Sequence, residues 1–154
     1  MVSQTLQSKG YMVCDAITRC RRAWSDRVKE VDLPLFPGYV FCRFDPLYRL
    51  PIVTTPNVVS VVGFGGVPEP VKESEMEAVQ ALLRSGLPVQ AWPFLRVGDT
   101  VTLTHGAFKG VEGILTQTKS RHRLVVSVTL LRRSVAVEIE DAFVRPASTR
   151  RPQG

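Results

Sequence analysis

The sequence predicts an α+β protein, in which an amino-terminal antiparallel sheet flanked by helices is followed by a small all-β barrel. The first part of the chain contains the clearest amphipathic helix, residues 74–84, in which Val79 and Leu82 share one face. The second part alternates apolar and polar residues over 124–130 and 135–139, the period of strands with one buried face. Glycines punctuate its opening strands, which is typical of a small closed barrel.

The other elements of the first part follow from apolar spacing and turn residues. Residues 1–9 contain no helix breaker, place Val2 and Leu6 on one helix face and precede Gly10, which predicts a helix that ends there. Ser74 and Glu77 are spaced for a capping box at the start of the later helix. β-branched and aromatic residues predict strands over 11–17, 27–33, 38–44 and 58–64, the last of them buried.

Composition places a domain boundary after the predicted helix. Residues 85–94 lack periodicity and contain two prolines and a glycine, which is typical of a linker. We therefore expect a domain over residues 1–86, a linker over 87–94, a β-barrel domain over 95–146 and a disordered tail over 147–154.

Charge is distributed unevenly along the chain. Residues 1–90 carry ten Lys and Arg against nine Asp and Glu, a net of +1, whereas residues 91–154 carry ten against five, a net of +5. A basic small domain favours an anionic partner such as RNA or DNA, with ordinary solubility charge as the alternative. No apolar run approaches the length of a membrane span, so we expect no membrane partner. We also expect a cytoplasmic protein and a monomer.

The sequence lacks the residue constellations of an enzyme or a metal site. Cys14, Cys20 and Cys42 have no CxxC spacing, which favours reduced thiols over a zinc site or a disulfide framework. His105 and His122 fall in predicted loops without a paired carboxylate. We therefore expect a binding protein with no catalytic residues, no metal and no cofactor.

Glycines at fixed spacing mark the start of the second part. The stretch 97–115 resembles the KOW motif, which several ribosomal proteins also carry. Gly106 and Gly110 suit a tight turn, and Gly113 allows one strand to bend across another. The matching positions are Gly98, Asp99, Gly106, Phe108, Gly110 and Gly113.

Motifs in the first part identify a resemblance to one family. They are LFPGYVF at 35–41, TPNV at 55–58 and VGFGG at 62–66, and with the KOW stretch they resemble the NusG family over residues 1–146. The resemblance implies a transcription elongation factor that binds the clamp helices of the largest RNA polymerase subunit. It also implies modulation of pausing, termination or antitermination. The alternative, a ribosome-associated KOW protein that binds ribosomal RNA, predicts a more basic first half.

The chain departs from the family pattern at two places. Family members begin with a strand that precedes the first helix, whereas this sequence opens inside that helix, so we expect the native start to lie upstream of Met1. The mass of the native protein tests this expectation. Asn57 stands where the family favours glycine, and because Asn tolerates the left-handed conformation we expect the same turn.

The resemblance assigns polymerase contact to the FPGY motif. Its positions are Phe36, Pro37, Gly38 and Tyr39, where the two prolines of the segment stiffen the backbone. The alternative interpretation is that Phe36, Tyr39 and Phe41 are core residues.

Two basic clusters are candidate contacts for further partners. Arginines near an aromatic residue can bind phosphates and stack on bases, which predicts nucleic-acid contact by Arg19, Arg21, Arg22, Trp24 and Arg27. The resemblance to the family implies that the nucleic acid is the nontemplate DNA strand, with nascent RNA as a further candidate. A solvated loop is the alternative, and this cluster favours a specialised, operon-specific paralogue.

The resemblance implies that a loop of the KOW domain contacts a small-subunit ribosomal protein or the Rho termination factor. Here that loop is Leu131, Arg132 and Arg133, in a predicted tight turn between two strands. The alternatives are an ordinary charged hairpin tip, or RNA contact through Lys109, Lys119, Arg121 and Arg123.

Overall fold

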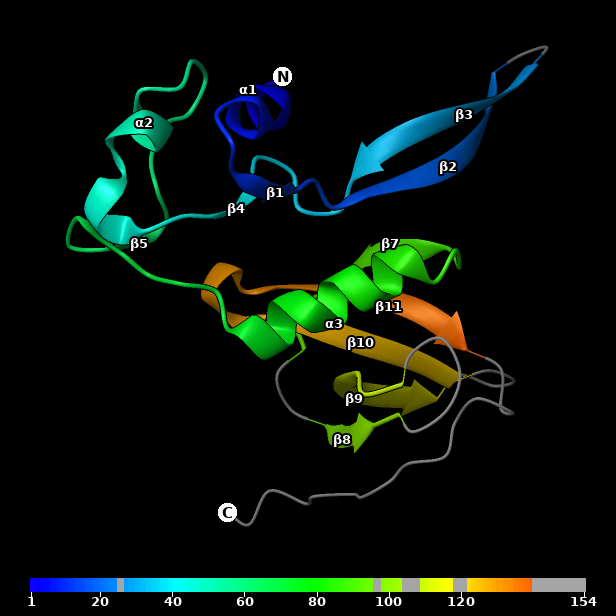
Figure 1. Ribbon diagram of the computed structural model, residues 1–154. Helices are drawn as coiled ribbons and strands as arrows, with labels where there is room; N and C mark the ends of the chain where they lie inside the picture. Colours follow the sequence, from blue (N-terminus) through cyan, green and yellow to red (C-terminus); the bar gives the residue numbers. More distant parts are fainter. Residues whose placement is uncertain (25–26, 96–97, 104–108, 118–121, 140–154) are drawn as a thin grey trace. The chain divides into compact units, whose positions relative to one another are not determined.

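The computed structural model describes residues 1–24, 27–95, 98–103, 109–117 and 122–139 (Figure 1). Contacts within the chain define two units: the first contains Met1–Ala16 and Phe36–Pro70, and the second contains Ile17–Leu35 and the chain from Val71 onward. Helices and antiparallel strand pairs occur together, which confirms the predicted α+β class. None of the described helices is long and apolar enough to cross a membrane.

The first unit is built from short elements. The helix predicted before Gly10 is present, and the strand after it pairs antiparallel with the strand that follows the FPGY motif. The buried residues Leu6, Phe36, Phe41 and Ile52 form its small core. Its elements are α1 (Val2–Ser8), β1 (Met12–Cys14), β4 (Phe41–Arg43), the 3-10 helix η1 (Pro46–Tyr48), α2 (Leu50–Val53), β5 (Gly63–Phe64) and β6 (Val67–Pro68).

The predicted buried strand over residues 58–64 is wrong. Only Gly63–Phe64 forms a strand, which pairs with Val67–Pro68 in a hairpin of two-residue strands. Val59 is 97% exposed and Val62 is 38% exposed. The described part of the chain offers residues 58–62 no strand to pair with, so their β-branched composition alone does not make a strand.

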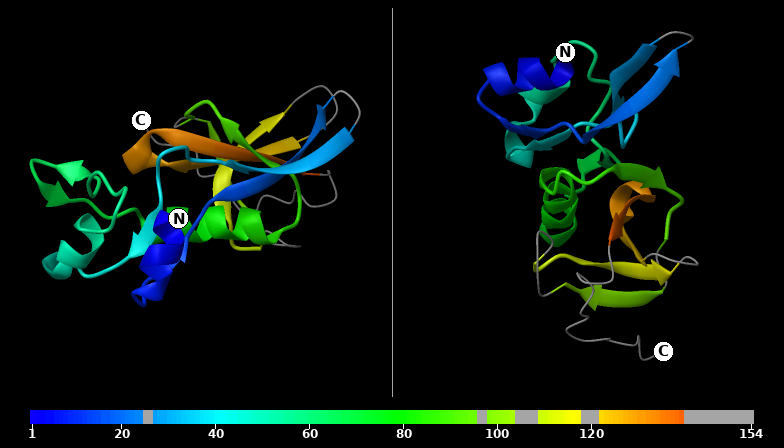
Figure 2. Two further views of the ribbon diagram at one scale, coloured as in Figure 1. Left: turned by 90° about the horizontal axis from the view of Figure 1, so that it is seen from above. Right: turned by 90° about the vertical axis from the view of Figure 1, so that its right-hand side faces the viewer.

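A two-stranded hairpin occupies the stretch after β1. Strands β2 (Ile17–Trp24) and β3 (Arg27–Pro34) pair antiparallel along their whole length (Figures 1 and 2). The sequence predicts β3 but treats residues 19–24 as a polar stretch, because their alternation contains too few apolar residues to be recognised as a strand.

The rest of the second unit is an antiparallel sheet with the order β7-β11-β10-β9-β8, here called the large sheet. Helix α3 (Glu73–Arg84) lies across it (Figure 1). The predicted capping box is wrong, because Lys72 is the N-cap and Ser74 lies inside the helix. The strands are β7 (Val89–Trp92), β8 (Asp99–Thr102), β9 (Glu112–Gln117), β10 (His122–Val128) and β11 (Arg133–Ile139).

The large sheet is buried on both faces of its central strands. Leu124 pairs with Val137 and Val126 with Val135 on one face, and all four side chains are buried. Val125 lies on the other face with Ile114 and Ala136, against Trp92 and Leu95. This double burial explains why strands predicted to have a wet face carry so many apolar residues.

The pairing of the edge strands β7 and β8 can be compared with the predicted linker and barrel. Strand β7 lies inside the predicted linker 87–94, and it pairs with β11 from Val89 to Trp92. Neither β7 nor β8 pairs with a further strand in the part of the chain that the structure describes. Closure into a barrel therefore stays a prediction, as do the domain boundaries, and the tail 147–154 lies outside the described residues.

Candidate functional site

The FPGY motif forms a tight turn in the first unit. The Tyr39 N–H donates to the Phe36 carbonyl over 3.0 Å, and Gly38 has φ +83°. Proline at the second position and a positive φ at the third define a type II turn. Nothing lies within 4 Å of a side chain built at Gly38, so glycine is required there for its backbone conformation and not for space.

The turn separates a buried anchor from an exposed tip. Phe36 is only 1% exposed and packs edge-to-face on Phe41, with the ring centroids 5.2 Å apart. Pro37 and Gly38 are exposed and Tyr39 is half-buried. Of the predicted contact residues, Phe36 therefore lies in the core, as the alternative interpretation expects, and the tip presents Pro37, Gly38 and part of Tyr39.

The TPNV motif forms a second turn with the same chemistry. The Val58 N–H donates to the Thr55 carbonyl over 3.1 Å, and Asn57 has φ +71°, which confirms that Asn adopts the left-handed conformation here. The turn is anchored by the buried Thr55 hydroxyl, which donates to the Pro51 carbonyl over 2.8 Å and accepts from Lys9 over 3.0 Å. Two of the motifs that carry the family resemblance are thus proline-initiated turns.

The first unit also exposes large apolar side chains close together in sequence. Leu47, Tyr48 and Leu50 are 85%, 72% and 69% exposed. The 3-10 helix η1, which contains Leu47 and Tyr48, is capped by the Asp45 carboxylate, which accepts from the Leu47 N–H over 3.0 Å. Apolar side chains held at the surface by an ordered backbone are typical of an interaction surface. The sequence analysis missed these residues, although the absence of a strand or helix period around them was a visible signal.

The predicted nucleic-acid cluster lies on the β2–β3 hairpin. Its backbone register pairs Arg19 with Asp32, Arg21 with Glu30, Arg22 with Lys29 and Trp24 with Arg27. Both strands of the hairpin therefore contribute residues to the predicted cluster, Arg27 from β3 and the other four from β2.

Close contacts explain why glycine occupies two of the KOW positions that the structure describes. A side-chain carbon at Gly113 would stand 2.8 Å from both a Leu124 methyl and the Val125 carbonyl oxygen, so strand β9 approaches β10 too closely for any other residue. A side chain at Gly98 would stand 2.6 Å from Ile114. Asp99 begins β8, and Gly110 adopts φ +84°. The other two KOW positions, Gly106 and Phe108, lie outside the described residues. So do His105, Lys119 and Arg121, which the sequence analysis names.

The loop between β10 and β11 is the tight turn that the sequence predicts. It consists of the 3-10 helix η3 (Thr129–Leu131) and Arg132, which has φ +51°. Leu131 is half-buried, and Arg132 and Arg133 are exposed. The three predicted partner-binding residues are therefore consecutive, with Leu131 and Arg132 in the loop and Arg133 at the start of β11.

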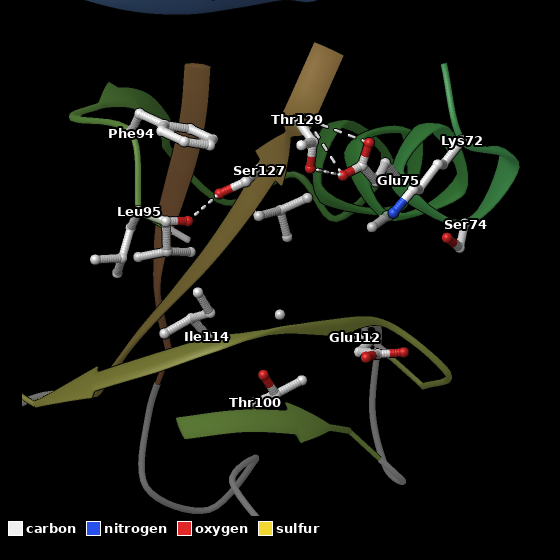
Figure 3. Close-up of a pocket in the computed structure, with 14 residues that line it drawn as sticks. Lys72, Ser74, Glu75, Phe94, Leu95, Thr100, Glu112, Ile114, Ser127 and Thr129 are labelled. Carbon is white, nitrogen blue, oxygen red and sulfur yellow. Dashed lines mark hydrogen bonds between the residues drawn. The ribbon is translucent and has the colours of Figure 1, made fainter. Parts of the chain in front are cut away.

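A carboxylate from helix α3 holds this loop. Glu75 accepts from the Thr129 N–H over 3.2 Å and from the Thr129 hydroxyl over 2.6 Å (Figure 3). The N–H at the start of a helical turn has no partner within the turn, so Glu75 caps η3 from another element. No local sequence signal predicts this contact, because its partners are 54 residues apart.

A pocket of about 240 Å³ opens between the start of α3 and the large sheet (Figure 3). Ala78, Ile114 and Val125 supply apolar lining, and Glu75 and Glu112 supply carboxylates. The volume is below the range of about 300–1,000 Å³ that is usual for small-molecule sites.

Arg123 is engaged within the large sheet. Its guanidinium lies 4.0 Å from the centre of the Trp92 ring and 3.4 Å from a Glu138 carboxylate oxygen. Of the alternative RNA contacts that the structure describes, Lys109 is exposed, whereas Arg123 is held by these two side chains.

The described cysteines have the chemistry of partly buried thiols. Burial raises the pKa of Cys14, and the nearby Asp15 charge raises it further; burial also raises the pKa of Cys42. Cys14 pairs with Phe41 and Cys42 with Val13, so the two thiols lie on opposite faces of the β1–β4 pair. Among the described residues, no group of three His, Cys, Asp or Glu side chains is placed to hold a metal ion.

Comparison with known proteins gives a consistent result. The family model described as "Transcription termination factor nusG" matches residues 1–80. A transcription termination/antitermination protein NusG from Lactococcus lactis subsp. lactis (strain IL1403) is 32% identical over 120 residues, 74% of this chain and 63% of the relative. The protein of the same name from Streptococcus pyogenes serotype M3 (strain ATCC BAA-595 / MGAS315) is 34% identical over 94 residues, 56% of this chain and 51% of the relative.

The chain thus spans about half to two thirds of the length of these relatives. The matched region contains both proline-initiated turns and helix α1. Since the family model covers more than half of the 154 residues, the chain belongs to the NusG family.

Proposed function

We propose that this protein is a transcription factor that docks on RNA polymerase and modulates pausing, termination or antitermination. Family membership supports the class, and the names of the relatives mention both termination and antitermination. The observation that carries the docking step is the FPGY turn, whose rigid tip presents Pro37 and Tyr39. The proposed receptor is the pair of clamp helices of the largest polymerase subunit.

The geometry of the turn suits this role. Proline and the type II turn fix the tip before binding, so little conformational entropy is lost when a partner covers it. Burial of an aromatic side chain contributes roughly 1.5–3 kcal/mol of binding free energy. The exposed Leu47, Tyr48 and Leu50 offer further apolar area in the same unit. We propose that they border the polymerase contact.

We further propose that the loop containing Leu131, Arg132 and Arg133 recruits a second partner, a small-subunit ribosomal protein or Rho. The capping by Glu75 supports this proposal, because a fixed loop loses less entropy on binding. Tethering to polymerase would raise the effective concentration of the partner near the transcript. The chain would act as a monomer and as a specialised, operon-specific member of the family.

The docking step is tested by binding of the purified chain to core RNA polymerase. Phe36 is unsuitable for substitution because it is buried and its loss would damage the core. Tyr39→Ala is expected to weaken binding at least tenfold. Tyr11→Ala is the matched control, since Tyr11 is also half-buried but precedes Met12, at the far end of the β1–β4 pair from Tyr39.

The control should bind within about twofold of the wild type, with thermal unfolding followed for each variant. Failure of a folded wild-type chain to bind polymerase would remove the proposal. Equal weakening by both tyrosine substitutions would show that the turn has no special part in docking.

A further inference from the structure

The loop between β10 and β11 contains a strained backbone. Val128 pairs with Arg133, so residues 129–132 form the loop, and Arg132 has φ +51° and ψ +46°. A residue with a β carbon adopts this left-handed conformation at an energetic cost, which is why glycine or asparagine is usual at such positions. The other non-glycine residue with a positive φ in the described part of the chain is Asn57. Among the described residues, Arg132 is therefore the one whose backbone most needs support from its surroundings.

Thr129 supports this conformation through the backbone. The Arg132 N–H donates to the Thr129 carbonyl over 3.1 Å, which closes the turn with the left-handed residue at its end. The bond forms only while Thr129 keeps its position. A contact that fixes Thr129 therefore also fixes the conformation of Arg132.

Glu75 of helix α3 fixes Thr129 from outside the loop (Figure 3). One carboxylate oxygen accepts from the Thr129 hydroxyl over 2.6 Å, and both oxygens lie 3.2 Å from the Thr129 nitrogen. The helix packs against β9 and β10, and its residues Ala78, Val79 and Leu82 are buried. The carboxylate is therefore presented to the loop from a firmly packed element.

The first turn of α3 is less firmly packed than the rest of the helix. Glu73 and Ser74 are exposed, and the pocket of about 240 Å³ opens beside this turn, where Glu75 and Thr129 line it together. Hydrogen bonds to a charged acceptor are stronger than those between neutral groups, so Glu75 ties this turn to the loop. Removing the carboxylate should release the loop without detaching the helix from the sheet.

We propose that Arg132, displayed from its left-handed conformation, recognises an acidic group on the second partner, and that Glu75 is the positioning residue that maintains this display through Thr129. The inference rests on the proposed recruitment of a second partner by this loop. Arg132 is exposed, and a guanidinium binds a carboxylate through a fork of two hydrogen bonds that tolerates little displacement. Glycine would remove the strain at this position, so the presence of arginine is explained by recognition.

The first test measures the conformation of the loop in the purified full chain and needs no partner. Glu75→Ala should accelerate hydrogen exchange at the Arg132 amide about fivefold or more, because its acceptor Thr129 is no longer held. Glu77→Ala, at an exposed position of the same helix, should leave the rate within about twofold. Glu75→Gln keeps an oxygen that accepts from Thr129 and should restore most of the protection.

A second substitution separates positioning from general stability. Arg132→Gly allows the left-handed conformation without strain, so the loop should no longer depend on Glu75. In this background Glu75→Ala should change protection at position 132 by less than about twofold, after correction for the intrinsic exchange rate of each residue. An equal effect of Glu75→Ala in both backgrounds would overturn the proposal.

The second test measures affinity for purified small ribosomal subunits and for purified Rho, the two proposed partners. Arg132→Gly should weaken binding about tenfold or more to whichever of them binds, and Glu75→Ala about threefold. The double variant should bind no more weakly than Arg132→Gly alone, because Glu75 acts through Arg132. Arg84→Ala is the charge control, since it removes an exposed cation from the last turn of α3, and should bind within about twofold of the wild type.

The outcomes separate this inference from the recruitment on which it rests. Wild-type affinity of Arg132→Gly, or losses that simply add in the double variant, would overturn the inference and leave recruitment standing. Failure of the wild type to bind either partner would overturn recruitment and the recognition role of Arg132 together. Normal exchange protection and thermal unfolding in the same samples would show that such a failure is not due to misfolding.

Discussion

The first unit and the large sheet differ in where they place their apolar residues. Leu47, Tyr48, Leu50 and Phe64 of the first unit are all more than two thirds exposed. No large apolar side chain on the described strands of the large sheet is exposed. Both regions contain many apolar residues. They differ in whether other elements pack against these side chains and cover them.

The large sheet covers its own apolar residues. Its five strands are four to seven residues long and α3 packs against β9 and β10, while Trp92 and Leu95 pack against the buried cluster of Ile114, Val125 and Ala136. The first unit has strands of only two or three residues and no comparable layer. The difference shows that the large sheet covers most of its apolar side chains itself, whereas the first unit leaves large apolar side chains exposed.

The largest expected effect separates the two regions by stability. Leu124→Ala removes a fully buried side chain of the large sheet and should cost about 2–5 kcal/mol of unfolding free energy. Leu47→Ala removes a leucine that is 85% exposed and should change stability by less than about 0.5 kcal/mol. Urea unfolding followed by circular dichroism measures both. A comparable loss in the two variants would break the comparison.

An intermediate effect is expected where α3 joins the large sheet. Glu75→Ala leaves the Thr129 N–H without its carboxylate acceptor and should cost about 1 kcal/mol. Glu77→Ala is the control, because Glu77 is an exposed glutamate of the same helix. Hydrogen exchange at the Thr129 amide should accelerate in the first variant alone. Unchanged exchange would show that α3 does not hold the loop.

The sequence predicts only part of this contrast between the first unit and the large sheet. Turn chemistry is local, so the turns at Gly38 and Asn57 follow directly from proline and a residue that tolerates positive φ. The alternation of the large sheet is likewise visible in the sequence. The strand predicted over residues 58–64 is absent from residues 58–62, although their composition favours one. A strand also needs a partner strand, which composition does not reveal.

The candidate sites likewise depend on packing and strand pairing that the sequence does not reveal. Phe36 belongs to the family motif but lies in the core, since its burial depends on Phe41 across a turn. The pairing of Arg22 with Lys29 in the β2–β3 hairpin depends on the register of the two strands, which composition does not reveal. Long-range pairing, such as that of Glu75 with Thr129, leaves no local pattern at all.

The smallest expected effect concerns how far water is excluded from the Cys14 and Cys42 thiols of the first unit. Burial holds the pKa of Cys14 and Cys42 above the ordinary value of 9.0 in the folded chain. In the unfolded chain the thiols ionise near pH 9, so their contribution to stability is complete below that pH. It is lost as the pH rises through the folded-state pKa, because the unfolded state then binds fewer protons.

The measurement compares the wild type with a Cys14→Ala, Cys42→Ala double variant between pH 8 and pH 10.5. The wild type should lose more unfolding free energy over this range than the variant does. Equal pH dependence would mean that water reaches both thiols in the folded state. The first unit would then lack a dry interior as well as a covered surface, and its contrast with the large sheet would be greater than the fold alone implies.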